Sequence, residues 1–192
     1  MIKNVYSIGF AIFIATMAVF LGMYFFGRNT DYFNNSLLIN AFLMPIIYVA
    51  GAYISVDSVR RAGIRMGFRG TFGRAFKPMF FGGFLSVIVM FLFLNFADPA
   101  AKDLLNYQYI ERQKTELTAE YNKAKELVKG PEEDAELERK YAERKESFAP
   151  EMIKGKDMFS FRQFTYYFAA ILIFYVIIST FFASFFRTRT EI

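Results

Sequence analysis

Four long stretches of the chain contain no acidic or basic residue, and the charged residues crowd between them. An α-helix rises about 1.5 Å per residue, so about 20 apolar residues cross the roughly 30 Å hydrocarbon layer of a bilayer. Each stretch is long enough and is predicted to form a transmembrane helix. The first span lies between Lys3 and Arg28, and the others are Leu37–Val56, Pro78–Ala97 and Phe164–Phe186.

The first span has a competing interpretation, a cleaved signal peptide. Its apolar part is longer than that of a signal peptide, and no small-residue cleavage site follows it before the segment NTDYFNN. We therefore expect this helix to remain in the mature protein from Met1 onward.

Small residues lie four positions apart in two of the spans, Gly51 with Ser55 and Gly82 with Ser86. Small side chains let neighbouring helix backbones approach closely in a membrane, so we expect these faces to pack within the bundle rather than to form a dimer. Pro45, in the middle of the second span, removes a backbone donor and predicts a kink.

The candidate intramembrane polar residues are Asn40, Ser55, Ser86 and Asn95. An interhelical hydrogen bond or a position at the membrane interface is the simplest role for Asn40, with contact to a substrate as the alternative. No Asp, Glu, Lys or Arg lies within any of the four spans. That absence argues against an ion-coupled carrier, because such carriers use charged groups or broken helices near the membrane midplane.

The charged region 98–162 is rich in helix-forming residues, and Gly130-Pro131 divides it into two stretches. Apolar residues recur three and four positions apart in both: Tyr107, Ile110, Leu117, Tyr121, Ala124 and Val128, then Leu137, Tyr141 and Phe148. Two such seams can bury each other, which predicts a helical hairpin outside the membrane. Residues 152–164, which follow, either lie along the membrane surface or form the first turns of the last helix.

Residues that carry chemistry are scarce, since the chain has no cysteine and no histidine. Thiolate and imidazole chemistry and the commonest zinc ligands are therefore absent. The acidic cluster Glu132, Glu133, Asp134, Glu136 and Glu138 lacks the spacing of a calcium loop and lies at a predicted helix start, where carboxylates favour the helix dipole. We expect no catalytic residue, no metal site and no cofactor.

Composition agrees with a membrane protein, because 55% of the 192 residues are hydrophobic and 26 are Phe. A soluble domain of this length needs far less apolar surface to fill one core. The formal net charge of +5 is small, so its distribution along the chain is more informative.

Basic residues gather in the connection 57–77, which contains only one carboxylate, at its first residue. The candidate contacts to lipid headgroups or a partner are Arg60, Arg61, Arg65, Arg69, Arg74 and Lys77. In a bacterial inner membrane, the positive-inside rule then places this connection and both termini, with Arg187 and Arg189, in the cytoplasm. Region 98–162 lies on the opposite side, in the periplasm.

The same six residues would suit a nucleic-acid patch in a soluble protein. Flanked by two spans, they cannot leave the membrane surface, so we expect no nucleic acid as partner. Fixing the topology and contacting the anionic lipids of the inner leaflet is the simplest interpretation, and Phe68, Phe72 and Phe76 could bury one face of a short interfacial helix. Specific capture of a phosphate-bearing lipid or an acidic partner is the alternative.

One short motif is similar to a segment found in a known protein family. The run Phe72-Gly73-Arg74-Ala75-Phe76-Lys77 leads into an apolar helix that ends in Asn95-Phe96-Ala97-Asp98-Pro99. This segment, and the order of elements along the whole chain, resembles the uncharacterised family of inner-membrane proteins catalogued as domain of unknown function forty-one ninety-nine, found mostly in Bacteroidota. This chain departs from the family's pattern in its arginine-rich turn and its longer outer loop.

The resemblance implies a four-helix inner-membrane protein with no known enzymatic activity and no catalytic residues. Members are often encoded near a small glycosyltransferase that acts on polyprenyl-phosphate sugars, which implies a role as its membrane partner.

The expected fold is all-α and polytopic: residues 1–97 hold three spans, residues 98–162 form the periplasmic hairpin, and residues 163–192 hold the fourth span and a cytoplasmic tail. The expected function is that of a non-enzymatic accessory or scaffold subunit of an inner-membrane complex. The alternative is a lipid-binding or small permeation protein, in which the intramembrane polar residues line a path.

Overall fold

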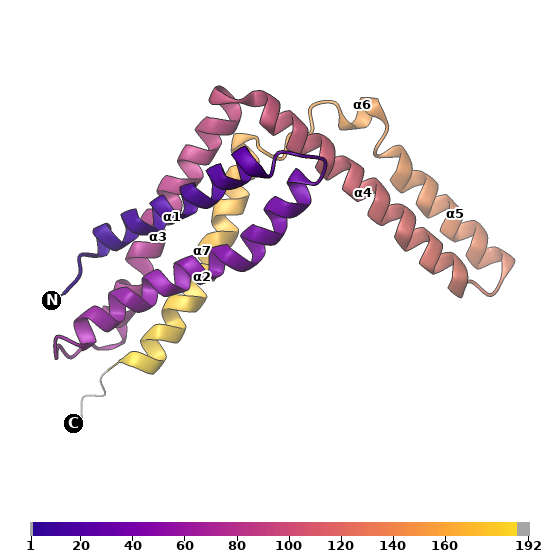
Figure 1. Ribbon diagram of the computed structural model, residues 1–192. Helices are drawn as coiled ribbons and strands as arrows, with labels where there is room; N and C mark the ends of the chain where they lie inside the picture. Colours follow the sequence, from indigo (N-terminus) through magenta and orange to yellow (C-terminus); the bar gives the residue numbers. More distant parts are fainter. Residues whose placement is uncertain (1, 188–192) are drawn as a thin grey trace.

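The computed structural model describes residues 2–187, which form helices joined by short turns, with no strand among them (Figure 1). Met1 and Arg189, which entered the predictions above, lie outside the described residues. The helices are α1 (Val5–Phe26), α2 (Tyr32–Arg60), α3 (Phe68–Leu92) with a π-helical extension (Phe93–Ala97), α4 (Pro99–Leu127), α5 (Pro131–Glu146), α6 (Pro150–Ile153) and α7 (Phe161–Phe186).

Four of these helices are long and apolar enough to cross a membrane: α1, α2, α3 with its extension, and α7. They contain 22, 29, 30 and 26 residues, and the mean hydropathy of the most apolar part of each is 2.0 or higher. α3 packs against each of the other three spans and forms the centre of the bundle. The prediction of an all-helical membrane protein with four spans is therefore confirmed.

The third span begins earlier than its sequence predicts. α3 starts at Phe68 and contains Pro78 in its interior, so the connection after α2 is only residues 61–67. A proline inside a helix removes one hydrogen bond, a loss that neighbouring helices compensate in membrane proteins. Phe76 and Phe80 stack across the proline with ring centroids 5.7 Å apart, which supports a continuous helix there.

The start of α3 is therefore not a separate interfacial helix. Phe72, Phe76, Phe80 and Phe84 form one row of stacked rings, with centroids 5.6–5.9 Å apart, along a single face of α3. Rings four residues apart stack in this way because they lie one above the other on a helix. The phenylalanines predicted to bury a short surface helix instead belong to a transmembrane one.

Glycines allow the spans to approach closely. A Cβ atom at Gly82 would lie 2.6 Å from the carbonyl oxygen of Gly9, and one at Gly51 would overlap Ile12. Ser86, one turn after Gly82, is buried and donates its hydroxyl to the Gly82 carbonyl oxygen at 2.8 Å. Both small-residue faces thus pack inside the bundle, as predicted.

Helices α4 and α5 form the predicted hairpin, which we call the arm. The arm turns sideways from the long axis of the bundle (Figure 1). Its predicted seam is present, because the rings of Tyr121 and Tyr141 stack with centroids 4.2 Å apart and Leu117 is buried. Lys125 adds ion pairs to Asp134 at 2.9 Å and Glu138 at 2.7 Å.

The chain returns from the arm through the short helix α6 and enters the membrane-spanning part at Phe161. Ser160 caps α7 by accepting a hydrogen bond from the backbone N–H of Gln163 at 3.4 Å. The last span therefore begins three residues before the predicted Phe164, and only the end of segment 152–164 belongs to it.

Candidate functional site

Two groups of polar residues lie at opposite ends of the bundle. We call the end with the α2–α3 turn the basic end, and the end from which the arm leaves the arm end (Figure 1). The predicted cation cluster lies at the basic end, whereas Asp98 and Asp157 organise the arm end.

Arg74 is the cation of the predicted cluster that points into the bundle. Its guanidinium donates hydrogen bonds to the carbonyl oxygens of Lys3 at 2.8 Å and Ser55 at 3.1 Å, and to the hydroxyl of Ser58 at 3.0 Å. All three bonds come from Nη2, so its two hydrogens are shared among the three acceptors. Arg74 therefore joins the chain segment before α1 to α2 and α3, a role that its position in a charge run does not reveal.

Two further arginines are engaged locally. Arg60 lies over the ring of Phe186, with its guanidinium carbon 5.4 Å from the ring centroid, and so connects the end of α2 to the end of α7. Arg61 pairs with Asp57 at 2.6 Å, one turn earlier, while 77% of its side-chain surface stays exposed. Both side chains have a contact within the chain before any ligand is considered.

The remaining cations, Arg65, Arg69 and Lys77, are exposed, and none of the ion pairs found among residues 2–187 involves them. Gly63 lies in the turn before them with a positive φ of 72°, a conformation that glycine adopts without strain. The predicted cluster of six thus divides into Arg74, which points into the bundle, two exposed arginines that contact a neighbouring side chain, and three exposed cations outside the ion pairs of the described residues.

The four predicted intramembrane polar residues do not share a surface. Ser55 is buried near Arg74 at the basic end, Ser86 is buried within α3, and Asn40 is exposed on α2. Asn95 lies at the arm end, where it donates to the carbonyl oxygen of Phe159 at 3.0 Å.

Asp98 is the centre of the first polar network at the arm end. Its carboxylate accepts hydrogen bonds from the Tyr24 hydroxyl at 2.8 Å and the Arg28 guanidinium at 2.7 Å, and it also caps α4 through the N–H of Ala101 at 3.1 Å. The hydrogen bond from Tyr24 and the nearby Arg28 charge hold the pKa of Asp98 below its usual value. Asp98 thus fixes the start of α4 to the end of α1.

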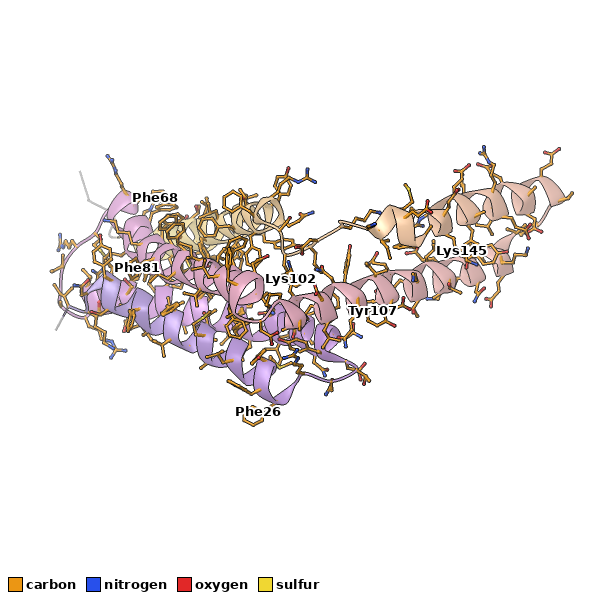
Figure 2. The ribbon with its side chains drawn as sticks, turned by 90° about the horizontal axis from the view of Figure 1, so that it is seen from above. Phe26, Phe68, Phe81, Lys102, Tyr107 and Lys145 are labelled. Atoms are coloured by element: carbon orange, nitrogen blue, oxygen red, sulfur yellow. The ribbon has the colours of Figure 1, made fainter. Side chains whose placement is uncertain are left out.

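Asp157 is the centre of the second network. It pairs with Lys102 at 2.9 Å and accepts hydrogen bonds from the Asn106 amide at 3.0 Å and the N–H of Phe159 at 2.8 Å. Partial burial alone would raise the pKa of Asp157, but the hydrogen bonds from Asn106 and Lys102 outweigh it, so the pKa lies below its usual value. This network joins the outgoing α4 to the returning chain, and Lys102 marks it in Figure 2.

The π-helical extension of α3 connects the two networks. The N–H of Asp98 donates to the carbonyl oxygen of Phe93 at 2.9 Å, a bond that spans five residues instead of four. Within this wider turn Asn95 accepts a hydrogen bond from Lys102 at 3.2 Å. Such turns insert a residue into a helix and are often found at functional sites.

A cleft of about 960 Å³ lies beside these networks, between the α1–α2 turn, the first turns of α2 and one face of α4. Gln108 connects its walls by donating to the carbonyl oxygen of Asn29 at 2.8 Å and accepting from the N–H of Phe33 at 2.7 Å. The cleft is lined by Arg28, Asn29, Thr30, Asn34, Leu38, Leu104, Tyr107, Gln108, Glu111, Arg112, Thr115 and Glu116. Tyr107 was predicted to lie in the seam of the arm, but it is 62% exposed and lines this cleft instead.

No group of three or more carboxylates that could hold a metal ion occurs within residues 2–187. The two ends of the molecule instead differ in their accessible polar groups: exposed cations at the basic end, and a cleft with both charged and apolar walls at the arm end.

Comparison with known proteins identifies the family and nothing closer. No curated protein and no solved structure matches the chain. A family model described as a protein of unknown function (DUF4199) matches residues 7–188, which is nearly the whole chain and includes the motif of residues 72–77 and all four spans. The chain therefore belongs to the DUF4199 family.

Proposed function

We propose that this protein is a non-enzymatic accessory subunit of a membrane complex and that the arm positions its partner. The observation that carries the proposal is the pair of networks around Asp98 and Asp157. They fix the segment that leaves the bundle and the segment that returns to it, both at the base of the arm. An arm joined by flexible linkers would sample many orientations. An arm that is fixed at both of its connections to the bundle presents the same surface in one direction, which is what a scaffold requires.

The surface of the arm suits a polar partner. α5 has no buried residue, and its exposed side chains carry both charges, as in the pairs Glu136–Lys140 and Arg144–Glu120. Complementary charges steer association and suppress wrong partners more than they add affinity. The partner that the family resemblance suggests is an inner-membrane glycosyltransferase acting on polyprenyl-phosphate sugars. This role assumes a bacterial inner membrane with the arm outside and the termini in the cytoplasm.

Site-specific photocrosslinking in cells tests the proposal. A photoreactive residue is placed at Glu132 or Lys140 on the arm and, as a control, at Phe42, which is 71% exposed on the membrane-facing side of α2. We expect one adduct of defined mass from the arm positions and none of that mass from Phe42. The adducted protein should also co-purify in fixed stoichiometry with the uncrosslinked chain. A chain that is free of adducts at both arm positions and purifies alone contradicts the proposal.

Lipid binding at the basic end is the second candidate function, because Arg65, Arg69 and Lys77 are exposed without an ion-pair partner among the described residues. Each basic residue near an anionic surface contributes about 1 kcal/mol of attraction. Permeation is less favoured, since the four intramembrane polar residues lie on different surfaces. Reconstituted protein with no anionic lipid retained and no flux would remove this second candidate.

A further inference from the structure

We propose that the cleft between α2 and α4 binds the headgroup of a zwitterionic phospholipid, one that carries a phosphate and an ammonium group. The inference requires the four spans to lie in a membrane but does not require the proposed partner. It rests on the volume of the cleft, the apolar surface that continues from it, and the charges of its walls.

The cleft lies where the chain changes from polar to apolar. The segment 29–36 before it is polar apart from two aromatic residues, and Leu38, at its edge, is 56% exposed. Phe42 and Ile46 follow at four-residue spacing and are 71% and 63% exposed. Residues four apart lie on one face of a helix, so an apolar stripe runs from the cleft along α2. An acyl chain can lie on this stripe while the headgroup occupies the cleft.

The sideways turn of the arm makes the cleft possible. α4 crosses the first turn of α2, held there by Gln108 and by Arg112, which donates to the Asn34 side chain at 3.0 Å. Beyond Tyr107, α4 continues away from the bundle, as Figure 2 shows. The face of α4 that passes the end of α2 therefore forms a wall at the level of lipid headgroups. A volume of about 960 Å³ lies at the upper end of the range for small-molecule sites, roughly 300–1,000 Å³.

The charges of the walls favour a zwitterion over a simple anion. Arg28 and Arg112 supply positive charge and Glu111 and Glu116 negative charge, and each arginine already has a carboxylate partner: Arg28 with Asp98 at 2.7 Å and Arg112 with Glu116 at 2.7 Å. An anion alone would compete with these carboxylates. Glu111 also has a partner, because it pairs with Lys114 at 2.8 Å. A headgroup that places its phosphate on Arg112 and its ammonium on Glu116 therefore keeps every charge paired, as partly desolvated charges require.

The test measures which lipid the full-length protein retains. The protein is reconstituted in nanodiscs of equal parts phosphatidylethanolamine and phosphatidylglycerol, extracted in mild detergent, and its lipids are quantified by mass spectrometry. We expect phosphatidylethanolamine to be enriched about fivefold over phosphatidylglycerol, the ratio that one additional partly exposed ion pair can provide. Arg112→Gln and Glu116→Gln should each return the ratio close to that of the nanodisc. Arg139→Gln, which removes a similar exposed pair with Glu143 on α5, should leave the enrichment unchanged.

Three results would overturn the proposal. A wild-type ratio equal to that of the nanodisc means non-specific surface lipid only. Enrichment of phosphatidylglycerol that increases in Glu116→Gln indicates an anionic ligand instead. Equal losses in Arg139→Gln and Arg112→Gln place the effect outside the cleft. Should Arg112→Gln lower the unfolding temperature, Glu116→Gln provides the same test through the opposite charge.

Discussion

Single glycines determine how closely the spans approach, and Gly82 gives the clearest test. Alanine there would place its Cβ 2.6 Å from the Gly9 carbonyl oxygen, so α1 would have to move away from α3. Overpacking of this kind costs about 1–3 kcal/mol, whereas alanine in place of glycine otherwise stabilises a helix by up to about 1 kcal/mol. We expect Gly82→Ala to lower the unfolding temperature in detergent.

Gly70, on the same helix, is the matched control. A Cβ at Gly70 would meet only the Met66 side chain, at 3.6 Å, which is an ordinary contact. Gly70→Ala should therefore leave the unfolding temperature unchanged or raise it, in the same thermal scan. Equal destabilisation by both variants would mean that the approach of α1 to α3 is not what Gly82 determines.

Asp98 makes stability dependent on pH. The hydrogen bond from Tyr24 is the main reason that the pKa of Asp98 lies below its usual value. The stabilisation that the ionised carboxylate gives the folded state is therefore present above the ordinary carboxyl pKa of about 4. It is lost as the pH falls through the lowered pKa of the folded state. Asp98→Asn removes this contribution. We expect the difference in unfolding temperature between wild type and Asp98→Asn to shrink as the pH falls from about 6 to about 3.

Asp31 gives the comparison for that titration. It is exposed at the start of α2 and makes no capping hydrogen bond with its side chain. Asp31→Asn should therefore follow the wild-type curve across the same pH range. A difference for Asp98→Asn that stays constant with pH would show that its charge is not the source of the stabilisation.

At the scale of elements, the seam of the arm rests on the stacked pair Tyr121 and Tyr141. Aromatic pairs contribute about 0.5–1.5 kcal/mol beyond their buried area, so Tyr141→Ala should let α5 separate from α4 more often. We expect trypsin to cleave the arm about fivefold faster in this variant. Glu143→Ala, which removes only a 3.9 Å contact with Arg139, is the control and should be cleaved at the wild-type rate.

The sequence predicts these elements well because their periodicity is local. All four spans and the division at Gly130 and Pro131 are present, although α2, α3 and α7 begin earlier than predicted. The predicted start of α3 at Pro78 is wrong, because phenylalanines stack on both sides of Pro78 along a continuous helix that begins at Phe68. A charge pattern does not distinguish a proline at a helix start from a proline inside a helix, because the difference here lies in side-chain contacts such as the stacking of Phe76 on Phe80.

The candidate sites were harder to predict because they depend on how the elements pack. Six basic residues look equivalent in sequence, but Arg74 alone reaches the carbonyl oxygens of Lys3 and Ser55. The sequence pattern does not single out Asp98 or Asp157, because their partners Tyr24 and Lys102 lie 74 and 55 residues away along the chain. The cleft has no sequence signal at all, since it arises from the direction in which α4 leaves the bundle.

At the scale of the whole molecule, the two ends of the bundle differ in how far their charges are balanced. The arm end balances acids and bases in networks, while the basic end leaves Arg65, Arg69 and Lys77 exposed. Uncompensated basic residues resist transfer across a membrane during insertion, so the basic end should remain in the cytoplasm. Arg74 differs, because its hydrogen bonds form only once the bundle has assembled.

Topology can be mapped directly because the chain has no cysteine of its own. Single cysteines are introduced at Gly67, in the α2–α3 turn, and at Leu127, which is 77% exposed at the tip of the arm. A membrane-impermeant maleimide should label Leu127→Cys in spheroplasts and Gly67→Cys only after lysis. Replacing Arg60, Arg61, Arg65 and Arg69 by Gln should make part of the Gly67→Cys population accessible without lysis.

Arg74→Gln separates topology from packing in the same assay. It should leave the labelling pattern unchanged but lower the unfolding temperature, because the carbonyl oxygens of Lys3 and Ser55 lose their shared donor. If the fourfold variant keeps the wild-type labelling pattern, the exposed arginines do not determine orientation. Their positive charge would then be better explained by the second candidate function, in which the basic end binds an anionic lipid.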